Sequence, residues 1–437
     1  MGTTRLNILN SKRYLKKYTA SKYKPTGNSN FYLASYTKSV GHYLLNNIFY
    51  IKNKRAFENI KFVMSDIYFG INYSIKIVKN EKFRNTFSKI VLSWGFKKDF
   101  NNKGSFYDKY FNTNSSNQKK ILWLIIYLDE EIPKKIQPNM ILIKVKGNKL
   151  LNILSWFKFL LLNITNLFKG FDYFLVNISS YSFLSKKILS SLKKILLKDY
   201  DEIIMPYEGQ PFQNEIIRFI KNKNTNTLTT GYIHSPPLAV PTNFIHKQFS
   251  PDRIFLNGKD QLFCFEKFLG WPKKKLNYIP SLRFRKTALK QENKIFIPYV
   301  VREHDKVLSM IKYIHNNVSN LNGYIVQNHP AAKNSKSNLE LISKIEKILS
   351  IKSFLKKKIY DLVLIGNSGG ISELLERNYS VIHICEDPEF ECFSGQIWKS
   401  IRTIKISRNI FTYKLKNKGN LIKFGKKNTD LNLILEN

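Results

Sequence analysis

The chain has 437 residues, which is more than one compact core normally holds and suits two domains of about 200 residues each. Hydrophobic residues make up 43% of the chain and aromatic residues 14%, so the composition excludes a largely disordered protein. Lys and Arg total 72 against 31 Asp and Glu, a formal net charge of +41, but they form no Arg-rich tract and we expect no nucleic acid partner.

The N-terminal half is predicted to begin with a basic arm over residues 1–30, followed by a first domain over residues 31–250. Short apolar runs bounded by polar residues predict buried strands at residues 59–66 and 121–131. Between them, residues 93–111 (SWGFKKDFNNKGSFYDKYF) carry many aromatics and little periodicity, which predicts a long functional loop.

The most membrane-like segment is residues 150–171, LLNILSWFKFLLLNITNLFKGF. Lys149, Lys158 and Lys169 divide it into pieces far shorter than the ~20 residues that a bilayer span needs, so an amphipathic helix is predicted. Two interpretations stay open: a helix whose apolar face lies in the core, and a basic helix lying on an anionic membrane surface. The positive net charge of the chain also has two possible explanations: drift in amino-acid composition, and attraction to lipid headgroups.

Strands and helices alternate from residue 201 onward, which predicts βαβ units and parallel sheets. Strands are expected within residues 201–206, 227–235, 252–258, 277–284, 294–301, 323–330, 361–367 and 380–385. Helices are expected within residues 210–222, 259–270, 306–317, 338–350 and 369–378. The fold class is therefore α/β, with two Rossmann-type, doubly wound domains facing a cleft. The boundary falls between about residues 245 and 292, and the second domain is taken as residues 251–437.

The compartment is inferred from the cysteines and the N-terminus. Cys264, Cys385 and Cys392 are too few and too widely spaced for a disulfide framework or a zinc knuckle, which indicates a reducing compartment. The basic N-terminus has no apolar core followed by a cleavage site, so no secretory signal is predicted. We expect a cytoplasmic protein and leave open a peripheral contact with the inner membrane.

Open parallel sheets bind ligands at the carboxyl ends of their strands, and a glycine-rich turn lies at one of these ends. Gly366, Asn367, Ser368, Gly369 and Gly370 separate a buried strand from a helix. Free backbone N–H groups at a helix start can hold a phosphate, which predicts a donor-binding loop. An ordinary turn with Ser368 as N-cap is the alternative. Glu373, inside the helix, is expected either to reach a ribose hydroxyl or to face solvent.

A second strand end carries the dipeptide His329-Pro330. Proline restricts the backbone of the residue before it, so the imidazole of His329 is held in place. Such an imidazole can stabilise or protonate a phosphate leaving group, and a strand-end histidine bonded to backbone is the alternative.

A third strand end carries Glu208 after Pro206 and Tyr207. Partial desolvation is expected to raise the pKa of Glu208 and to let it take a proton from a hydroxyl nucleophile. Gly209 is expected to leave room for a substrate. The alternative is an acid that complements the dipole of the following helix.

Further candidates for binding the acceptor or the sugar are Gln210, His234, Ser235, Arg283 and Gln396. No DxD-type acid pair lies at a predicted strand end, so we expect no metal ion and no cofactor. The nearest acids, Asp387 and Glu389, are assigned to a flexible loop over the donor.

A carboxylate-Gly motif, a His-Pro motif and a Ser-containing loop, in this chain order, resemble the motifs of bacterial sialyltransferases and capsular Kdo transferases. More closely, the segments PYEGQPFQNEIIRFIK, TGYIHSPP, PDRIFLNG and YIPSLRF are similar to bacterial surface-carbohydrate (O-antigen or capsule) biosynthesis proteins. This resemblance implies a GT-B fold, with Glu208 as general base, His329 facing the donor phosphate, and the Ser368 loop as its further ligand. Two departures are visible: Tyr207 replaces the first acid of the sialyltransferase motif, and Asn328 precedes His-Pro.

The resemblance implies an inverting, metal-independent glycosyltransferase. It would move a sugar, with a CMP-activated nonulosonic acid or Kdo favoured, onto a surface glycan or a lipid-linked acceptor. Three alternatives stay open: a polyol-phosphate transferase, a sugar-nucleotide epimerase because NSGGISELL resembles that family's nucleotide loop, and a non-catalytic basic protein on the same scaffold that binds a membrane surface or nucleic acid.

Overall fold

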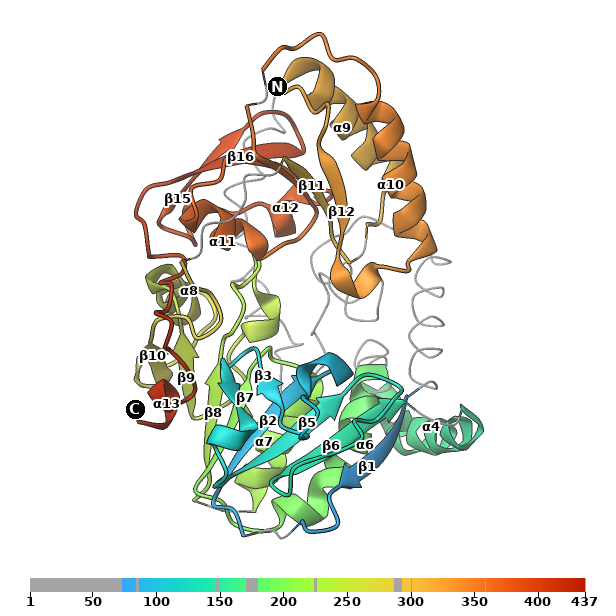
Figure 1. Ribbon diagram of the computed structural model, residues 1–437, viewed down its shortest axis with the longest axis vertical. Coiled ribbons are helices and arrows are strands. Elements are labelled where there is room, and N and C mark those ends of the chain that lie inside the picture. Colours follow the sequence, from blue (N-terminus) through green and yellow to red (C-terminus); the bar gives the residue numbers. More distant parts are fainter. Residues whose placement is uncertain are drawn as a thin grey trace.

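The computed structural model describes residues 73–83, 86–146, 149–169, 180–223, 226–286, 293–299, 301–357 and 359–436. The predicted basic arm and the strand expected at residues 59–66 lie outside these ranges. Two lobes are stacked along the long axis of the molecule, and each is built on one sheet (Figure 1).

Eight strands of the described residues form the first sheet, in the order β1-β6-β5-β2-β7-β8-β9-β10. Neighbouring strands are parallel except β1, which runs antiparallel to β6. The strands are β1 (Tyr73–Lys79), β2 (Lys89–Gly95), β5 (Ile121–Tyr127), β6 (Met140–Lys146), β7 (Glu202–Pro206), β8 (Leu228–Tyr232), β9 (Arg253–Leu256) and β10 (Leu276–Tyr278).

The two faces of this sheet are covered differently, because successive residues of a strand point to opposite sides. From β2, Ile90 and Leu92 join the core with α6 (Ser180–Leu196) and α7 (Pro211–Asn222). Val91 faces the other way and packs with Phe106, Phe111 and Leu431. The short β3–β4 hairpin and the C-terminal α13 therefore cover the second face. Their bounds are β3 (Tyr107–Asp108), β4 (Thr113–Asn114) and α13 (Asn432–Leu435).

The second sheet has the order β12-β11-β13-β14-β16-β15, with β11 to β14 parallel and the β15–β16 hairpin antiparallel. Its strands are β11 (Lys294–Ile297), β12 (Ile325–Asn328), β13 (Leu362–Ile365), β14 (Val381–Ile384), β15 (Ile401–Lys405) and β16 (Ile410–Leu415). Val363 and Ile365 pack under α9 and α10, whereas Leu362 and Leu364 pack on the α11 side. These helices are α9 (His304–Asn317), α10 (Lys336–Leu349), α11 (Gly370–Glu376) and α12 (Pro388–Glu391).

The two lobes share one core and are tied by buried polar contacts. A single cluster of buried apolar side chains continues from the first sheet to Leu364 and Trp398 of the second. The Trp398 Nε1–H donates to the carbonyl of Ala239 (3.0 Å), and the N–H of Ser400 donates to Asp260 (2.7 Å), which lies on α8 (Lys259–Lys267). After β16 the chain returns to the first lobe, where α13 lies beside β9 and β10 (Figure 1).

The predicted α/β class with two largely parallel sheets is confirmed. The first sheet runs past residue 250, because β9 pairs with β8 and β10 pairs with β9, so the sheets change between Tyr278 and Lys294. This change comes later than residue 251, where we began the second domain, and the division into domains stays a prediction. The predicted start of the long loop, residue 93, was wrong, since Ser93 to Gly95 complete β2.

The segment at residues 150–171 forms α4 (Lys149–Asn163) and a 3₁₀ continuation, η3 (Ile164–Lys169). α4 lies outside β1 at the edge of the first lobe (Figure 1). Within the described part of the chain, no helix is long and apolar enough to cross a bilayer.

Candidate active site

Glu208 lies in a tightly fastened turn between β7 and α7. The Gln213 side chain accepts the N–H groups of Glu208 and Gln210, both at 3.1 Å, and donates to the carbonyl of Pro206. Gln210 Nε2 donates to Glu208 Oε2 at 2.6 Å, so the carboxylate is held from its own turn. The side chain of Glu208 is 29% exposed, which leaves it open to a substrate hydroxyl.

Gly209 lets the turn adopt a backbone conformation and a close contact that a larger residue would not permit. Its φ is +69°, a left-handed conformation that favours glycine, and an added Cβ would lie 2.2 Å from the carbonyl oxygen of Asn243. The buried Lys247 donates to the carbonyls of Gly209 (3.2 Å) and Asn243 (3.1 Å), and burial lowers the pKa of Lys247 to about 7. The space expected for a substrate at Gly209 is therefore filled by protein on the Cβ side.

His234, at the end of β8, contacts the carboxylate of Glu208. Its Nε2 lies 3.2 Å from Glu208 Oε1, and the side chain is 3% exposed. Burial lowers the pKa of His234, while the hydrogen bond that its imidazole donates to Glu208 opposes that change. A neutral imidazole with its proton on Nε2 would donate to the carboxylate, and its buried Nδ1 has no hydrogen-bond partner.

Tyr110 lies beside Glu208 and His234, and it was not among the residues predicted from the sequence. Its ring lies 4.4 Å from that of His234, edge to face. Burial raises the pKa of Tyr110, and the charge of Glu208 raises it further. Asp108 accepts the N–H groups of Tyr110 (2.8 Å) and Phe111 (3.1 Å), and burial raises the pKa of Asp108 to about 6. The hairpin loop over the sheet therefore brings Tyr110 to His234, and a functional role of this loop stays a prediction.

Arg283 and Ser235 lie beside the same group. Arg283 Nη1 donates to Ser235 Oγ at 2.7 Å, and its guanidinium carbon lies 5.9 Å from the centre of the Tyr110 ring. Arg283 is exposed, so its remaining donors can reach a ligand. Five of the predicted residues, Glu208, Gln210, His234, Ser235 and Arg283, are thus brought together.

The glycine-rich loop lies where β13 meets α11, as predicted. Gly366 has a φ of +65°, and its carbonyl accepts a hydrogen bond from the buried His383. Both side-chain amide atoms of Asn367 are buried without a partner. Ser368 Oγ accepts the N–H of Gly370 at 3.2 Å, whereas the helix N-cap is Gly369. The unpaired amide of Asn367 is a polar group that a ligand would satisfy.

The glycine-rich loop touches the first lobe at Gly369. A Cβ added there would lie 2.2 Å from the carbonyl oxygen of Pro236, which follows His234 and Ser235. The two sets of predicted residues therefore meet at one contact between the lobes.

Replacing Gly369 by Ala should separate the lobes locally. The backbone at Gly369 is helical, so only the collision with Pro236 opposes the added methyl group. We expect a loss of about 1–3 kcal/mol in the free energy of unfolding, measured by urea denaturation. Gly370→Ala is the matched control, since its Cβ would meet only the Ser368 hydroxyl at 3.2 Å; equal losses in both variants would contradict the contact.

His329 lies at the end of β12, on the same sheet edge. Its N–H donates to the carbonyl of Ile297 on β11 (3.0 Å), and its ring lies 5.9 Å from that of Tyr299. Burial lowers the pKa of His329. Pro298, the residue after β11, would lie 3.4 Å from a Cβ at Gly366. The carboxyl ends of β12, β11 and β13 therefore lie side by side. Pro330 is exposed and begins a short 3₁₀ turn, Pro330–Ala332.

The remaining predicted residues lie on α11 and around α12. The Glu373 carboxylate accepts hydrogen bonds from Arg377 at 2.9 Å, which holds it along the helix. Gln396 lies between α12 and β15, where its N–H donates to Ser394 Oγ. Residues Pro388–Glu391, expected in a flexible loop, form the short helix α12, with Asp387 as its N-cap. Among the described residues, no cluster of three or more His, Cys, Asp or Glu is placed to hold a metal ion.

Comparison with known proteins gives distant structural likeness only. No protein-family model matches the chain, and no curated protein matches it. The crystal structure of α,α-trehalose 6-phosphate synthase from Burkholderia multivorans matches with a TM-score of 0.37 and 10% identity, over 69% of this chain and 86% of that one. A structure described as trehalose-6-phosphate from E. coli bound with UDP-2-fluoroglucose matches with a TM-score of 0.34 and 10% identity, over 69% and 88%. Scores this low carry no argument about function.

Proposed function

We propose that the protein is an inverting, metal-independent glycosyltransferase of GT-B type, whose donor and acceptor bind where the two lobes meet. The contact between Gly369 and Pro236 carries the proposal, because it brings the glycine-rich loop to the strand end that holds His234. The resemblance of the motifs to surface-carbohydrate enzymes supplies the reaction. An O-antigen or capsular pathway fits those motifs.

Glu208 is the proposed general base. Its two oxygens accept hydrogen bonds from Gln210 and His234, which fix the carboxylate, and its side chain is 29% exposed. Glu208 would take the proton of an acceptor hydroxyl. The hydroxyl oxygen would then bond to the anomeric carbon as the bond from that carbon to the donor phosphate breaks, with inversion.

The leaving phosphate would be held by the second lobe. The unpaired amide of Asn367 offers a donor, and the imidazole of His329 lies at the end of a neighbouring strand of the same sheet. Such groups stabilise charge that develops on the leaving oxygen. Arg283, exposed beside Tyr110, suits the carboxylate of an acidic sugar, which is the feature that favours a nonulosonic acid or Kdo.

A nucleotide panel tests the donor. We expect CMP to raise the melting temperature of the purified protein more than UDP or GDP, because binding to the folded state alone stabilises it by mass action. Asn367→Ala should reduce that shift, and Asn317→Ala, on the exposed face of α9, is the control. A shift with UDP alone would remove the CMP assignment, and no shift with any nucleotide would count against the enzyme.

A further inference from the structure

α4 and η3 carry a cluster of exposed apolar side chains. In the described part of the chain, seventeen large hydrophobic residues are exposed, and eight of them lie between residues 153 and 168. We call these eight the α4 surface; they are Ile153, Leu154, Phe157, Leu161, Leu162, Ile164, Leu167 and Phe168. Single exposed apolar residues are normal on a protein, but such a cluster marks an interaction site.

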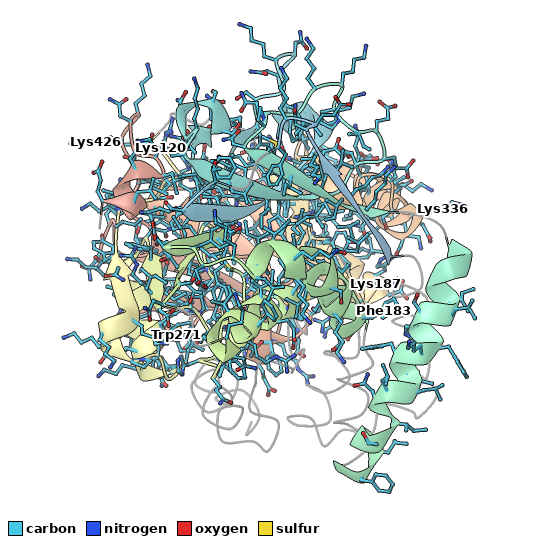
Figure 2. The ribbon with its side chains drawn as sticks, turned by 90° about the horizontal axis from the view of Figure 1, so that it is seen from below. Lys120, Phe183, Lys187, Trp271, Lys336 and Lys426 are labelled. Carbon is cyan, nitrogen blue, oxygen red and sulfur yellow. The ribbon has the colours of Figure 1, made fainter. Side chains whose placement is uncertain are left out.

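The opposite side of α4 attaches the helix to the first lobe. Phe159 is buried with its ring 5.3 Å from that of Phe183 on α6, and Trp156 and Leu160 pack against the core. Ile153, Phe157 and Leu161 follow at intervals of four residues and form a separate stripe that faces away from this contact. Figure 2 shows α4 as a rod at the edge of the molecule, beyond Phe183 and Lys187. The helix is therefore anchored on one side and open on the other.

Lysines dominate the charges of the segment that carries the α4 surface and of the following helix α6. Between residues 149 and 198 the sequence contains eight lysines and one acidic residue, Asp172. Lys158 is exposed in the middle of α4, and Lys193 and Lys194 are exposed on α6. An apolar helical face flanked by lysines is complementary to an anionic lipid surface, where apolar side chains enter the boundary layer and ammonium groups meet headgroups. A protein partner would not require this excess of lysines over acids.

We propose that the α4 surface docks on an anionic lipid bilayer, with α4 and η3 lying in the plane of the membrane. The 21 residues from Lys149 to Lys169 divide into a helix of 15 residues and a 3₁₀ turn of six, so the segment rests on the bilayer and does not cross it. The inference does not depend on sugar transfer. It would place the protein where a lipid-linked acceptor is found.

Vesicle flotation of the purified full-length chain tests the proposal. We expect binding to vesicles of phosphatidylcholine mixed with phosphatidylglycerol and little binding to phosphatidylcholine alone. Phe157→Ser/Leu161→Ser should lower the partition coefficient about tenfold or more, because both side chains leave the bilayer boundary. Lys193→Gln/Lys194→Gln should lower it about fivefold for each lysine, and added salt should reduce that difference.

Matched controls separate this surface from the net charge of the whole chain. Phe168 is 93% exposed on the α4 surface and Phe354 is 95% exposed in the other lobe. Phe168→Ser should weaken vesicle binding, whereas Phe354→Ser should not. Failure of the wild type to bind mixed vesicles, or equal binding by the Phe157→Ser/Leu161→Ser variant with an unchanged circular dichroism spectrum, would overturn the proposal. So would an oligomer that the same variant converts to a monomer while vesicle binding persists.

Discussion

Replacing Glu208 by Gln should lower the rate of sugar transfer by about 10²–10⁴-fold, the range that a positioned general base contributes. The amide keeps the size of the carboxylate and can still accept from Gln210, but it cannot take a proton. The folded state and the nucleotide-induced rise in melting temperature should persist, because Glu208 belongs to the first lobe and the proposed donor groups belong to the second. The measurement is turnover with a nucleotide-sugar donor, together with thermal unfolding of both proteins.

The matched control for this prediction is Glu346→Gln. Glu346 is exposed on α10, and the same change of chemistry there should leave the transfer rate as it is. His234→Ala should also lower the rate, because Glu208 would lose the imidazole 3.2 Å from Oε1. If Glu208→Gln turned over as fast as the wild type, Glu208 would not be the base, whereas loss of the nucleotide effect as well would indicate a folding defect.

Much of the fold follows from periodicity, and the exceptions have physical causes. The strands β7, β11 and β13 are short apolar runs that end at Pro206, before Pro298 and before Gly366, and they were predicted. The end of β2 was missed because its residues Ser93-Trp94-Gly95 read as a loop, although pairing with Ile125 to Tyr127 of β5 keeps them extended. Ladder pairing comes from a partner strand distant in the chain, so local pattern cannot show it.

Some residues of the candidate site could likewise be predicted from the sequence, and others could not. Glu208 and His234 follow neighbouring strands of the first sheet and the glycine-rich loop follows a strand of the second, so the rule for strand ends could propose them together. Tyr110 lies on a hairpin that packs across the sheet, where Phe111 contacts Tyr232, and this long-range packing brings Tyr110 to His234. Arg377 lies one helical turn from Glu373 and holds its carboxylate, a contact that was not predicted from the sequence, and a role of Glu373 toward a ligand stays a prediction.

The surface of α4 shows where composition alone leaves a choice. The sequence allowed a core helix or a membrane helix, because either carries an apolar stripe. Phe159 and Leu154 are both apolar residues of α4, yet one is buried and the other is 72% exposed. Phe159 is covered because it meets Phe183 of α6, and which side chains of α4 meet α6 is a property of the packed structure.

Arg302→Met should lower the free energy of unfolding by about 3–5 kcal/mol, the cost of leaving buried carboxylates without their cation. Arg302 donates through Nη2 to Glu391, and its Nε lies 3.6 Å from Glu386 Oε2. The side chains of Glu386 and Glu391 are 2% and 3% exposed. Glu386 also accepts the N–H groups of Arg302 and Glu303, both at 2.7 Å, so the carboxylates and the start of α9 form one cluster. Arg402→Met, on the exposed side of β15, should change stability by no more than about 0.5 kcal/mol.

The deficit of Arg302→Met should depend on pH in a defined direction. Burial raises the pKa of Glu391 above its ordinary value, and Arg302 opposes that rise in the wild type. A carboxyl whose pKa is raised in the folded state costs stability once the pH exceeds its unfolded pKa of about 4.3. The variant should therefore lose stability relative to the wild type as the pH rises above about 4.3, and the two should converge in acid. Arg302→Met/Glu391→Gln should recover part of the loss.

The Arg302 cluster also lies beside the glycine-rich loop, because Glu386 Oε2 would lie 3.6 Å from a Cβ at Gly366. Arg302→Met should accordingly reduce the nucleotide-induced rise in melting temperature at a pH where the variant is still folded, since the turn that presents Asn367 loses its support. Urea denaturation across pH, with and without nucleotide, measures both effects. An Arg302→Met variant as stable as Arg402→Met at neutral pH would show that the two carboxylates are held without the guanidinium, and the proposed support of the loop would then have no basis.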